Sequence, residues 1–210
     1  MESFLEIVEW RPNLFHSIDL WGSKTKWEEF GKIVRNCGGL FVLNMAKMEG
    51  EVCDYPSIRA GNIVELNLSQ TKIDDHFLVY ISENLPKLGI LNVSSCENLT
   101  ANGIKRASFP SLRFLGIANC KVGVESIIYC ISHHEIFAMC VERTLSKEET
   151  AHLVDVFPDI AELGIPSLCG LPQGIVSPKA LSPLCFYCRS SSLATVLTVK
   201  QSMDGSWMEL

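Results

Sequence analysis

Residues 88–122 read LGILNVSSCENLTANGIKRASFPSLRFLGIANCKV, and this stretch holds two copies of one phrase. The phrase is Leu-x-x-Leu-x-Val/Ile-x-x-Cys, first at residues 88–96 and again at 112–120, which is 24 residues further along. A proline stands two residues before each copy, at Pro86 and Pro110. Apolar residues at this spacing are common in any chain, so the test is whether the phase persists beyond these two copies.

The phase does persist. We number the slots of each unit from one to nine, with Leu88 in slot one. Slot one recurs every 23 to 25 residues, at Phe15, Leu40, Ile63, Leu88, Leu112, Ile136 and Ile160. Slot four holds Ile18, Leu43, Leu66, Leu91, Leu115, Met139 and Leu163, and slot six holds Leu20, Met45, Leu68, Val93, Ile117, Val141 and Ile165. Every one of these positions is apolar, whereas a chain with 47% apolar residues would fill about half of them by chance.

A period of roughly 20–29 residues carrying this phrase is the signature of leucine-rich repeats. It predicts an α/β solenoid of about seven repeats, with a parallel sheet on the concave face and helices on the convex face. Slots four and six share one side of each strand, because side chains alternate in direction. A single unit cannot bury them, so neighbouring units stack around one core. In slot nine, a small polar side chain can satisfy backbone groups of the turn, and Cys96 and Cys120 occupy this slot in the two most regular units.

The chain divides into three segments. We expect residues 1–14 to form an N-terminal flank or cap, 15–168 the repeat domain, and 169–210 a degenerate C-terminal cap or a poorly ordered tail. Helical spacing predicts helices at 24–36, 74–85, 101–108 and 124–132, and a capping-box pattern predicts another at 146–157. The crossover at 47–62 is expected to be irregular, and residues 194–199 resemble a strand outside the repeat phase.

Composition excludes several classes of partner. The net charge is −6, and no lysine or arginine cluster is present, which argues against nucleic acid and against an anionic membrane surface. The sequence contains no run of eighteen apolar residues, so no membrane span is expected. The nine cysteines are odd in number and several occupy repeat slots, so reduced thiols in the cytoplasm or nucleus fit better than a disulfide framework.

Candidate chemistry is sparse. Cys185-x-x-Cys188 has the spacing of half a zinc site but lacks a second pair, so two cysteines in a terminal cap are the preferred interpretation. Two further polar groups, His133-His134 and Asp74-Asp75-His76, fall at expected helix ends, where they suit the helix dipole. We therefore expect no enzyme activity, no catalytic residue, no cofactor and no metal site.

The predicted site is the concave face, formed by slots three, five and seven. The partner-binding residues expected there are Trp21, Val42, Asn44, Glu65, Asn67, Ile90, Asn92, Phe114 and Glu142. Among these, Trp21, Val42, Ile90 and Phe114 would expose apolar groups, and exposed apolar clusters mark interaction sites. The three asparagines share slot five of successive strands and form a column. Either the amides suit the strand end and bond to one another, or they contact the partner.

One further stretch resembles a known family. Cys96-Glu97-Asn98-Leu99-Thr100-x-x-Gly103-Ile104 is similar to the cysteine-containing leucine-rich repeat of F-box proteins and of Zyg-type receptors, and the run IVELNLSQT at 63–71 favours the Zyg type. In both groups the repeats present substrates to cullin-based ubiquitin ligases. The resemblance therefore implies a substrate-recognition subunit, with a protein substrate and cullin ligase subunits as partners.

The resemblance covers the repeats alone. Neither an F-box nor an Elongin-binding box is recognisable before slot one of the first unit, so the element that docks onto a ligase is expected to lie elsewhere or to be absent. The alternative is a scaffold or regulator outside the ligase system that binds a protein through the same concave face.

Overall fold

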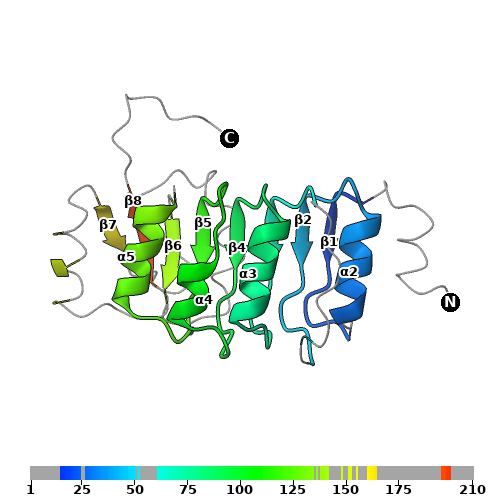
Figure 1. The fold of residues 1–210 in the computed structure, drawn as a ribbon, viewed down its shortest axis with the longest axis horizontal. Coiled ribbons are helices and arrows are strands. Elements are labelled where there is room, and N and C mark those ends of the chain that lie inside the picture. Colours follow the sequence, from blue (N-terminus) through cyan, green and yellow to red (C-terminus); the bar gives the residue numbers. More distant parts are fainter. Residues whose placement is uncertain are drawn as a thin grey trace.

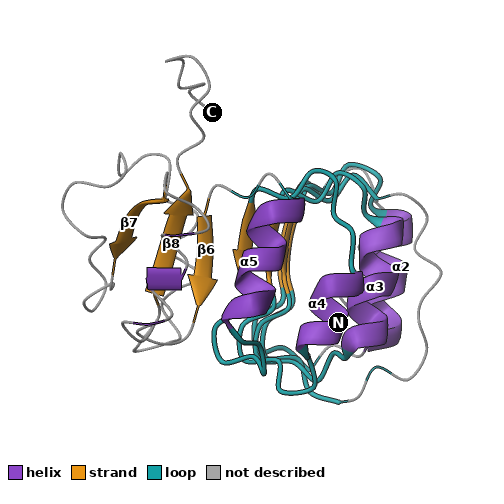
Figure 2. Ribbon diagram, turned by 60° about the vertical axis from the view of Figure 1, so that its left-hand side comes forward, coloured by secondary structure: helices purple, strands orange, loops and turns teal. Residues whose placement is uncertain are grey.

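The computed structural model describes residues 15–24, 27–50, 52, 61–134, 136, 138–141, 148, 151–152, 155, 160–164 and 195–199. The fold is α/β, with parallel strands in one layer and helices in a second layer against one face of the sheet (Figures 1 and 2). This arrangement confirms the α/β class of the prediction.

The strands follow one another across the sheet in chain order. They are β1 (Ser17–Asp19), β2 (Val42–Asn44), β3 (Glu65–Asn67), β4 (Ile90–Asn92), β5 (Phe114–Gly116) and β6 (Ala138–Val141), and each of the first five is parallel to the strand that follows it. All six begin at slot three, and the register pairs equal slots, as in Leu43 with Leu66 and Leu66 with Leu91. The sequence phase therefore sets the register, because a slip of one residue would turn every inward side chain outward.

The helices lie where the spacing predicts them. They are α2 (Trp27–Asn36), α3 (Asp75–Asn84), α4 (Ala101–Arg106) and α5 (Val124–His133), each within three residues of its predicted bounds. Asp74 is the N-cap of α3, where its Oδ1 accepts the Phe77 N–H at 2.8 Å. The helix predicted at 146–157 lies mostly outside the described residues, as do residues 1–14.

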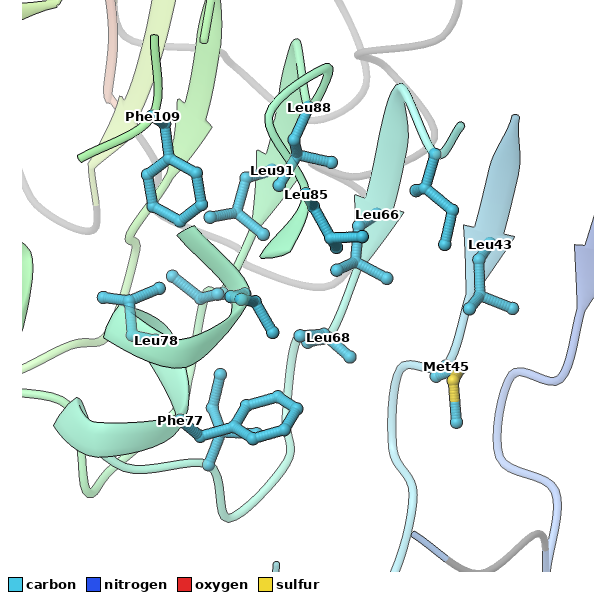
Figure 3. Close-up of a cluster of buried hydrophobic side chains, with 14 of the residues drawn as sticks. Leu43, Met45, Leu66, Leu68, Phe77, Leu78, Leu85, Leu88, Leu91 and Phe109 are labelled. Carbon is cyan, nitrogen blue, oxygen red and sulfur yellow. The ribbon is translucent and has the colours of Figure 1, made fainter. Parts of the chain in front are cut away.

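The core lies between the two layers (Figure 3). The strands contribute residues of slots one, four and six, among them Leu43, Leu66 and Leu91, each fully buried. Helix α3 contributes Phe77, Leu78 and Ile81, with 0–1% of their surface exposed. Burying one such side chain contributes roughly 1.5–3 kcal/mol. Phe77 meets Trp27 and Phe30 of α2 edge to face, at centroid distances of 5.3 and 5.9 Å, so these aromatic rings join the two helices.

Slot nine satisfies backbone groups in three units, and the small polar side chain of Thr71 does so as the sequence predicts. Cys96 Sγ donates to the Leu68 carbonyl at 3.2 Å, and Cys120 Sγ donates to the Val93 carbonyl at 3.1 Å. Thr71 Oγ1 donates to that same Leu68 carbonyl at 2.6 Å. In the first two bonds the acceptor is slot six of the preceding unit, so a buried thiol links neighbouring units.

Slot eight turns the chain after each strand. Its backbone is left-handed in the first five units, with φ near 60° at Gly22, Lys47, Gln70, Ser95 and Asn119. In the first four of these units the slot-eight N–H donates to the slot-seven carbonyl of the following unit. One turn geometry therefore repeats along this edge of the sheet.

Neighbouring helices are also joined by side chains. Asp75, the first residue of α3, accepts the Thr100 N–H at 2.8 Å and the Thr100 hydroxyl at 2.6 Å. Thr100 is the N-cap of α4, and a Cβ on Gly103 would lie 2.8 Å from the Asp75 Cβ. Glycine is therefore required in the third position of α4, because any side chain there would meet Asp75.

The last part of the sheet differs from the prediction. The seventh strand is present as β7 (Ile160–Gly164), but it does not pair with β6. Instead β8 (Thr195–Val199) lies between them and is antiparallel to both. The expectation of seven successive parallel strands is thus wrong at its last step. A segment from the predicted tail, already resembling a strand in sequence, occupies the edge of β6.

Candidate functional site

The surface predicted to bind a partner is the face of β1–β5 turned away from helices α2–α5. We call it the far face, and it presents slots three, five and seven. Its exposure falls from β1 towards β5. In slot seven, Trp21 is 57% exposed, whereas Ala46, Ser69, Ser94 and Ala118 are buried. In slot five, Asp19 is exposed and Asn44 half-buried, whereas Asn67, Asn92 and Gly116 are buried. The most accessible side chains of the far face are therefore those at its β1–β2 end.

One predicted apolar contact is wrong. Phe114 is only 4% exposed, so its ring offers little surface to a partner. It lies in slot three of β5, in register with Ile90 of β4. Val42 and Ile90 are half-buried and still reach solvent.

Of the two carboxylates predicted for the site, Glu65 and Glu142, only Glu65 lies in the described part of the chain. Glu65 lies in slot three between Val42 and Ile90, with which it is in register on either side. Burial raises the pKa of the Glu65 carboxyl, because desolvation disfavours its charged form. The other predicted carboxylate, Glu142, lies outside the described residues.

The asparagine column has a structural explanation. The side-chain Oδ1 of Asn44, Asn67 and Asn92 accepts the backbone N–H two residues further on, at 3.2, 3.0 and 3.0 Å. Each amide thus fixes the turn that follows its strand. This supports the first of the two predicted explanations, in which the amides suit the strand end.

On either side of the three asparagines, slot five holds a different residue type. In β1 the slot-five residue is Asp19, whose Oδ1 accepts the Trp21 N–H at 3.0 Å and the Asn44 Nδ2–H at 2.9 Å. In β5 the slot holds Gly116, and Ser94 Oγ from the neighbouring unit accepts the Ala118 N–H at 3.2 Å. The turn after β5 is therefore fixed from the adjacent unit, and the row of slot-five side chains stops at Asn92.

Two contacts were missed by the sequence reasoning. Phe41 is 45% exposed and Val64 is 40% exposed, and together with Trp21 they are the exposed large hydrophobic residues of the described ranges. Both occupy slot two, just before β2 and β3, and Phe41 stacks on His16 of the same slot at 6.0 Å. The missed signal was an apolar residue in slot two of adjacent units, a position that lies just before the strand and so outside the alternation of strand side chains.

A cation lies over the ring of Trp21. The Lys47 ammonium, from slot eight of the next unit, lies 4.6 Å from the centroid of the Trp21 ring. Such a cation–π contact contributes about 0.5–1 kcal/mol at an exposed site. The indole is thereby held in place while more than half of its surface stays open to solvent.

The other candidate groups have structural roles. His133 lies in the last turn of α5, stacks on Tyr129 at 4.0 Å, and its Nδ1 is 2.9 Å from the Tyr129 carbonyl. Asp74 and Asp75 cap helices as described above. Over the described ranges, no group of three or more potential metal-binding side chains comes together. Cys185 and Cys188 lie outside those ranges.

The described cysteine side chains are thiols. Cys37, Cys96 and Cys130 are buried, Cys120 is half-buried, and all four are free. Burial raises the pKa of the Cys130 thiol to about 12, so this sulfur stays neutral near neutral pH and is a poor nucleophile. These four residues agree with the expectation of reduced cysteines in core positions.

Comparisons with known proteins do not assign a family. No protein-family model matches the chain, and no curated protein is similar to it at a significant level. Where the structure describes helices, none is both long and apolar enough to cross a bilayer.

Proposed function

We propose that the chain is a leucine-rich repeat solenoid that acts as a protein-interaction module, with the far face as its concave binding surface. The observation that carries this proposal is the exposure of Trp21, 57% of whose surface is open at the accessible end of that face. Tryptophan is enriched among the residues that dominate binding energy at protein interfaces, and exposed apolar groups mark such interfaces.

The repeated geometry supports the solenoid. Equal slots pair from β1 to β5, and the same left-handed turn follows each of these strands. Stacked units of this kind build one extended surface rather than a closed pocket. Binding and orienting a partner is the activity that such a surface supports, and no catalytic step is part of the proposal.

The partner class comes from the resemblance of residues 96–104 to the cysteine-containing repeats of cullin ligase receptors. We propose substrate recognition for such a ligase as the function, in the cytoplasm or nucleus. A scaffold or regulator outside the ligase system would use the same surface. The ligase receptor and the scaffold differ in which proteins bind to the chain in the cell.

The test is an affinity purification of the full chain from cells, analysed by mass spectrometry. Stoichiometric cullin, Skp adaptor or Elongin subunits support the ligase role. If only other proteins are recovered, the ligase role is refuted, and the chain is a scaffold for those proteins.

Two variants locate the binding surface in the same experiment. Trp21→Ala removes the most exposed ring of the far face, and Lys32→Ala is the control, an exposed residue of α2 on the other side of the sheet. We expect Trp21→Ala to lose the substrate or partner and Lys32→Ala to retain it. Recovery that is equal in both variants would place the binding surface elsewhere.

A further inference from the structure

Asp19 is the only charged member of the slot-five row in β1–β4. Its Oδ1 accepts the N–H two residues further on, which is the same bond that the amide oxygens of Asn44, Asn67 and Asn92 accept in the next three units. A neutral amide is therefore sufficient for the turn. The negative charge of Asp19 is not required by the fold, which points to a role in recognition.

The surroundings of Asp19 favour a cationic ligand. Asp19 and Trp21 are both exposed, two residues apart, on the same side of β1. The slots of the far face in β1–β5 hold the carboxylates Asp19 and Glu65 and no lysine or arginine. The nearest described base, Lys47, comes from slot eight, and its position over the Trp21 ring demonstrates that a cation is accommodated there. A partner that is complementary in charge would bring a cation to this end of the face.

We propose that Asp19 and Trp21 form a receptor for an arginine side chain of the partner protein. This inference rests on the proposed function and specifies the chemistry of its binding surface. A guanidinium group is planar, stacks on aromatic rings and donates hydrogen bonds to a carboxylate, whereas an ammonium offers a point charge. Oδ1 of Asp19 already accepts two hydrogen bonds, so Oδ2 is the acceptor for the guanidinium. The Lys47 side chain is exposed, so it can turn into solvent when the guanidinium takes its place.

Apolar contacts complete the receptor at the other end of the strands. Phe41 and Val64 precede β2 and β3 and leave 45% and 40% of their surfaces exposed. Trp21 follows the end of β1, so the two exposed apolar areas lie at opposite ends of the short strands. A partner segment that crosses the face along the strand direction would place an apolar side chain on Phe41 and Val64 and its arginine on Asp19 and Trp21.

Asp19→Asn tests the charge without changing the turn. The oxygen of the substituted amide can accept the same two hydrogen bonds, and asparagine already accepts the turn bond in the next three units. The variant should therefore fold and unfold like the wild type. Glu97→Gln is the matched control, because it removes one negative charge from an exposed residue of the turn after β4. Circular dichroism and urea unfolding verify both variants before binding is measured.

The probe is a phage-displayed library of random peptides, selected on the immobilised full chain and read by sequencing. We expect wild type and Glu97→Gln to enrich peptides with arginine beside apolar residues. The best peptide is then synthesised with arginine and with citrulline, which keeps the shape and loses the charge. Citrulline should weaken binding to the wild type by about fivefold, the upper range of an exposed ion pair. Asp19→Asn should bind both peptides equally weakly.

The outcomes separate this inference from the proposed function. Selected peptides without arginine, or equal affinity of wild type and Asp19→Asn for the arginine peptide, overturn the arginine receptor. If the selected peptides nevertheless bind Trp21→Ala more weakly than the wild type in either of these cases, the far face remains the binding surface. If no peptide exceeds a mock selection, or if none responds to Trp21→Ala, the receptor is refuted and the proposed binding surface loses its support.

Discussion

Replacing Gly103 by alanine sets two effects of opposite sign against each other. Gly103 lies in α4, where alanine is a better helix former than glycine by about 1 kcal/mol. However, the new Cβ would lie 2.8 Å from the Asp75 Cβ, a distance that real Cβ atoms essentially never show. Asp75 must then move and lose its two hydrogen bonds to Thr100, at 2.8 and 2.6 Å.

The loss is larger than the gain. A hydrogen bond to a charged group contributes roughly 1.5–3 kcal/mol, and the half-buried carboxylate of Asp75 places its two bonds at the lower end of that range. Subtracting the helix-propensity gain leaves a net destabilisation of about 2 kcal/mol for Gly103→Ala. Urea unfolding of the full chain, followed by circular dichroism, measures this difference directly.

The variant Asp75→Gly tests whether the contact with Asp75 causes the destabilisation. In Asp75→Gly the Cβ that opposes residue 103 is absent, so Gly103→Ala should become neutral or stabilising there. The sign of the effect thus reverses between the two backgrounds. A chain whose stability is unchanged or increased by Gly103→Ala in the wild-type background would refute the proposed contact between α3 and α4.

Three further predictions concern the core, a helix cap and pH. Phe77→Ala removes a fully buried ring that meets Trp27 at 5.3 Å, and it should lower the free energy of unfolding by about 3–5 kcal/mol, measured in urea. Gly123→Ser should raise it by about 0.5 kcal/mol in the same assay, because the N-cap of α5 has no side-chain hydrogen bond and open space surrounds this glycine. Burial and the charge of His133 lower the pKa of His134 below 6.5, so the unfolded chain binds this proton more tightly, and stability should fall as pH drops through about 6.5. His134→Gln should reduce that fall when unfolding is compared at about pH 7.5 and 5.5, and an equal fall in both proteins would refute the assignment.

The sequence predicts the layers and the register of this fold because each unit repeats one local rule. Inward slots four and six are apolar in every unit, so the strand phase and the core side of each strand follow from spacing alone. The helix bounds follow from caps such as Asp74, which bonds within its own segment. Such information lies within a few residues and needs no knowledge of the tertiary structure.

The features that were not predicted depend on contacts between distant segments. β8 pairs with β6 across more than fifty residues of chain, and no periodicity specifies such an antiparallel partner. The burial of Phe114 depends on the side chains around it, whereas its slot predicts exposure. For the same reason the exposed part of the candidate site is narrower than predicted, with Trp21 as its most exposed residue, because exposure on the far face depends on the neighbouring strands.

The left-handed turns in slot eight have a consequence for how the chain can be shortened. Four of these five turns use a residue other than glycine, and this conformation costs such a residue roughly 1–2 kcal/mol. In the first four units the slot-eight N–H bonds to a carbonyl of the following unit, so the support for a strained turn comes from its C-terminal neighbour. Deleting a unit from the C-terminal side therefore removes the support of the unit before it, whereas deleting the first unit leaves the remaining turns supported. Truncation should consequently be tolerated better from the N-terminal side of the sheet than from the C-terminal side.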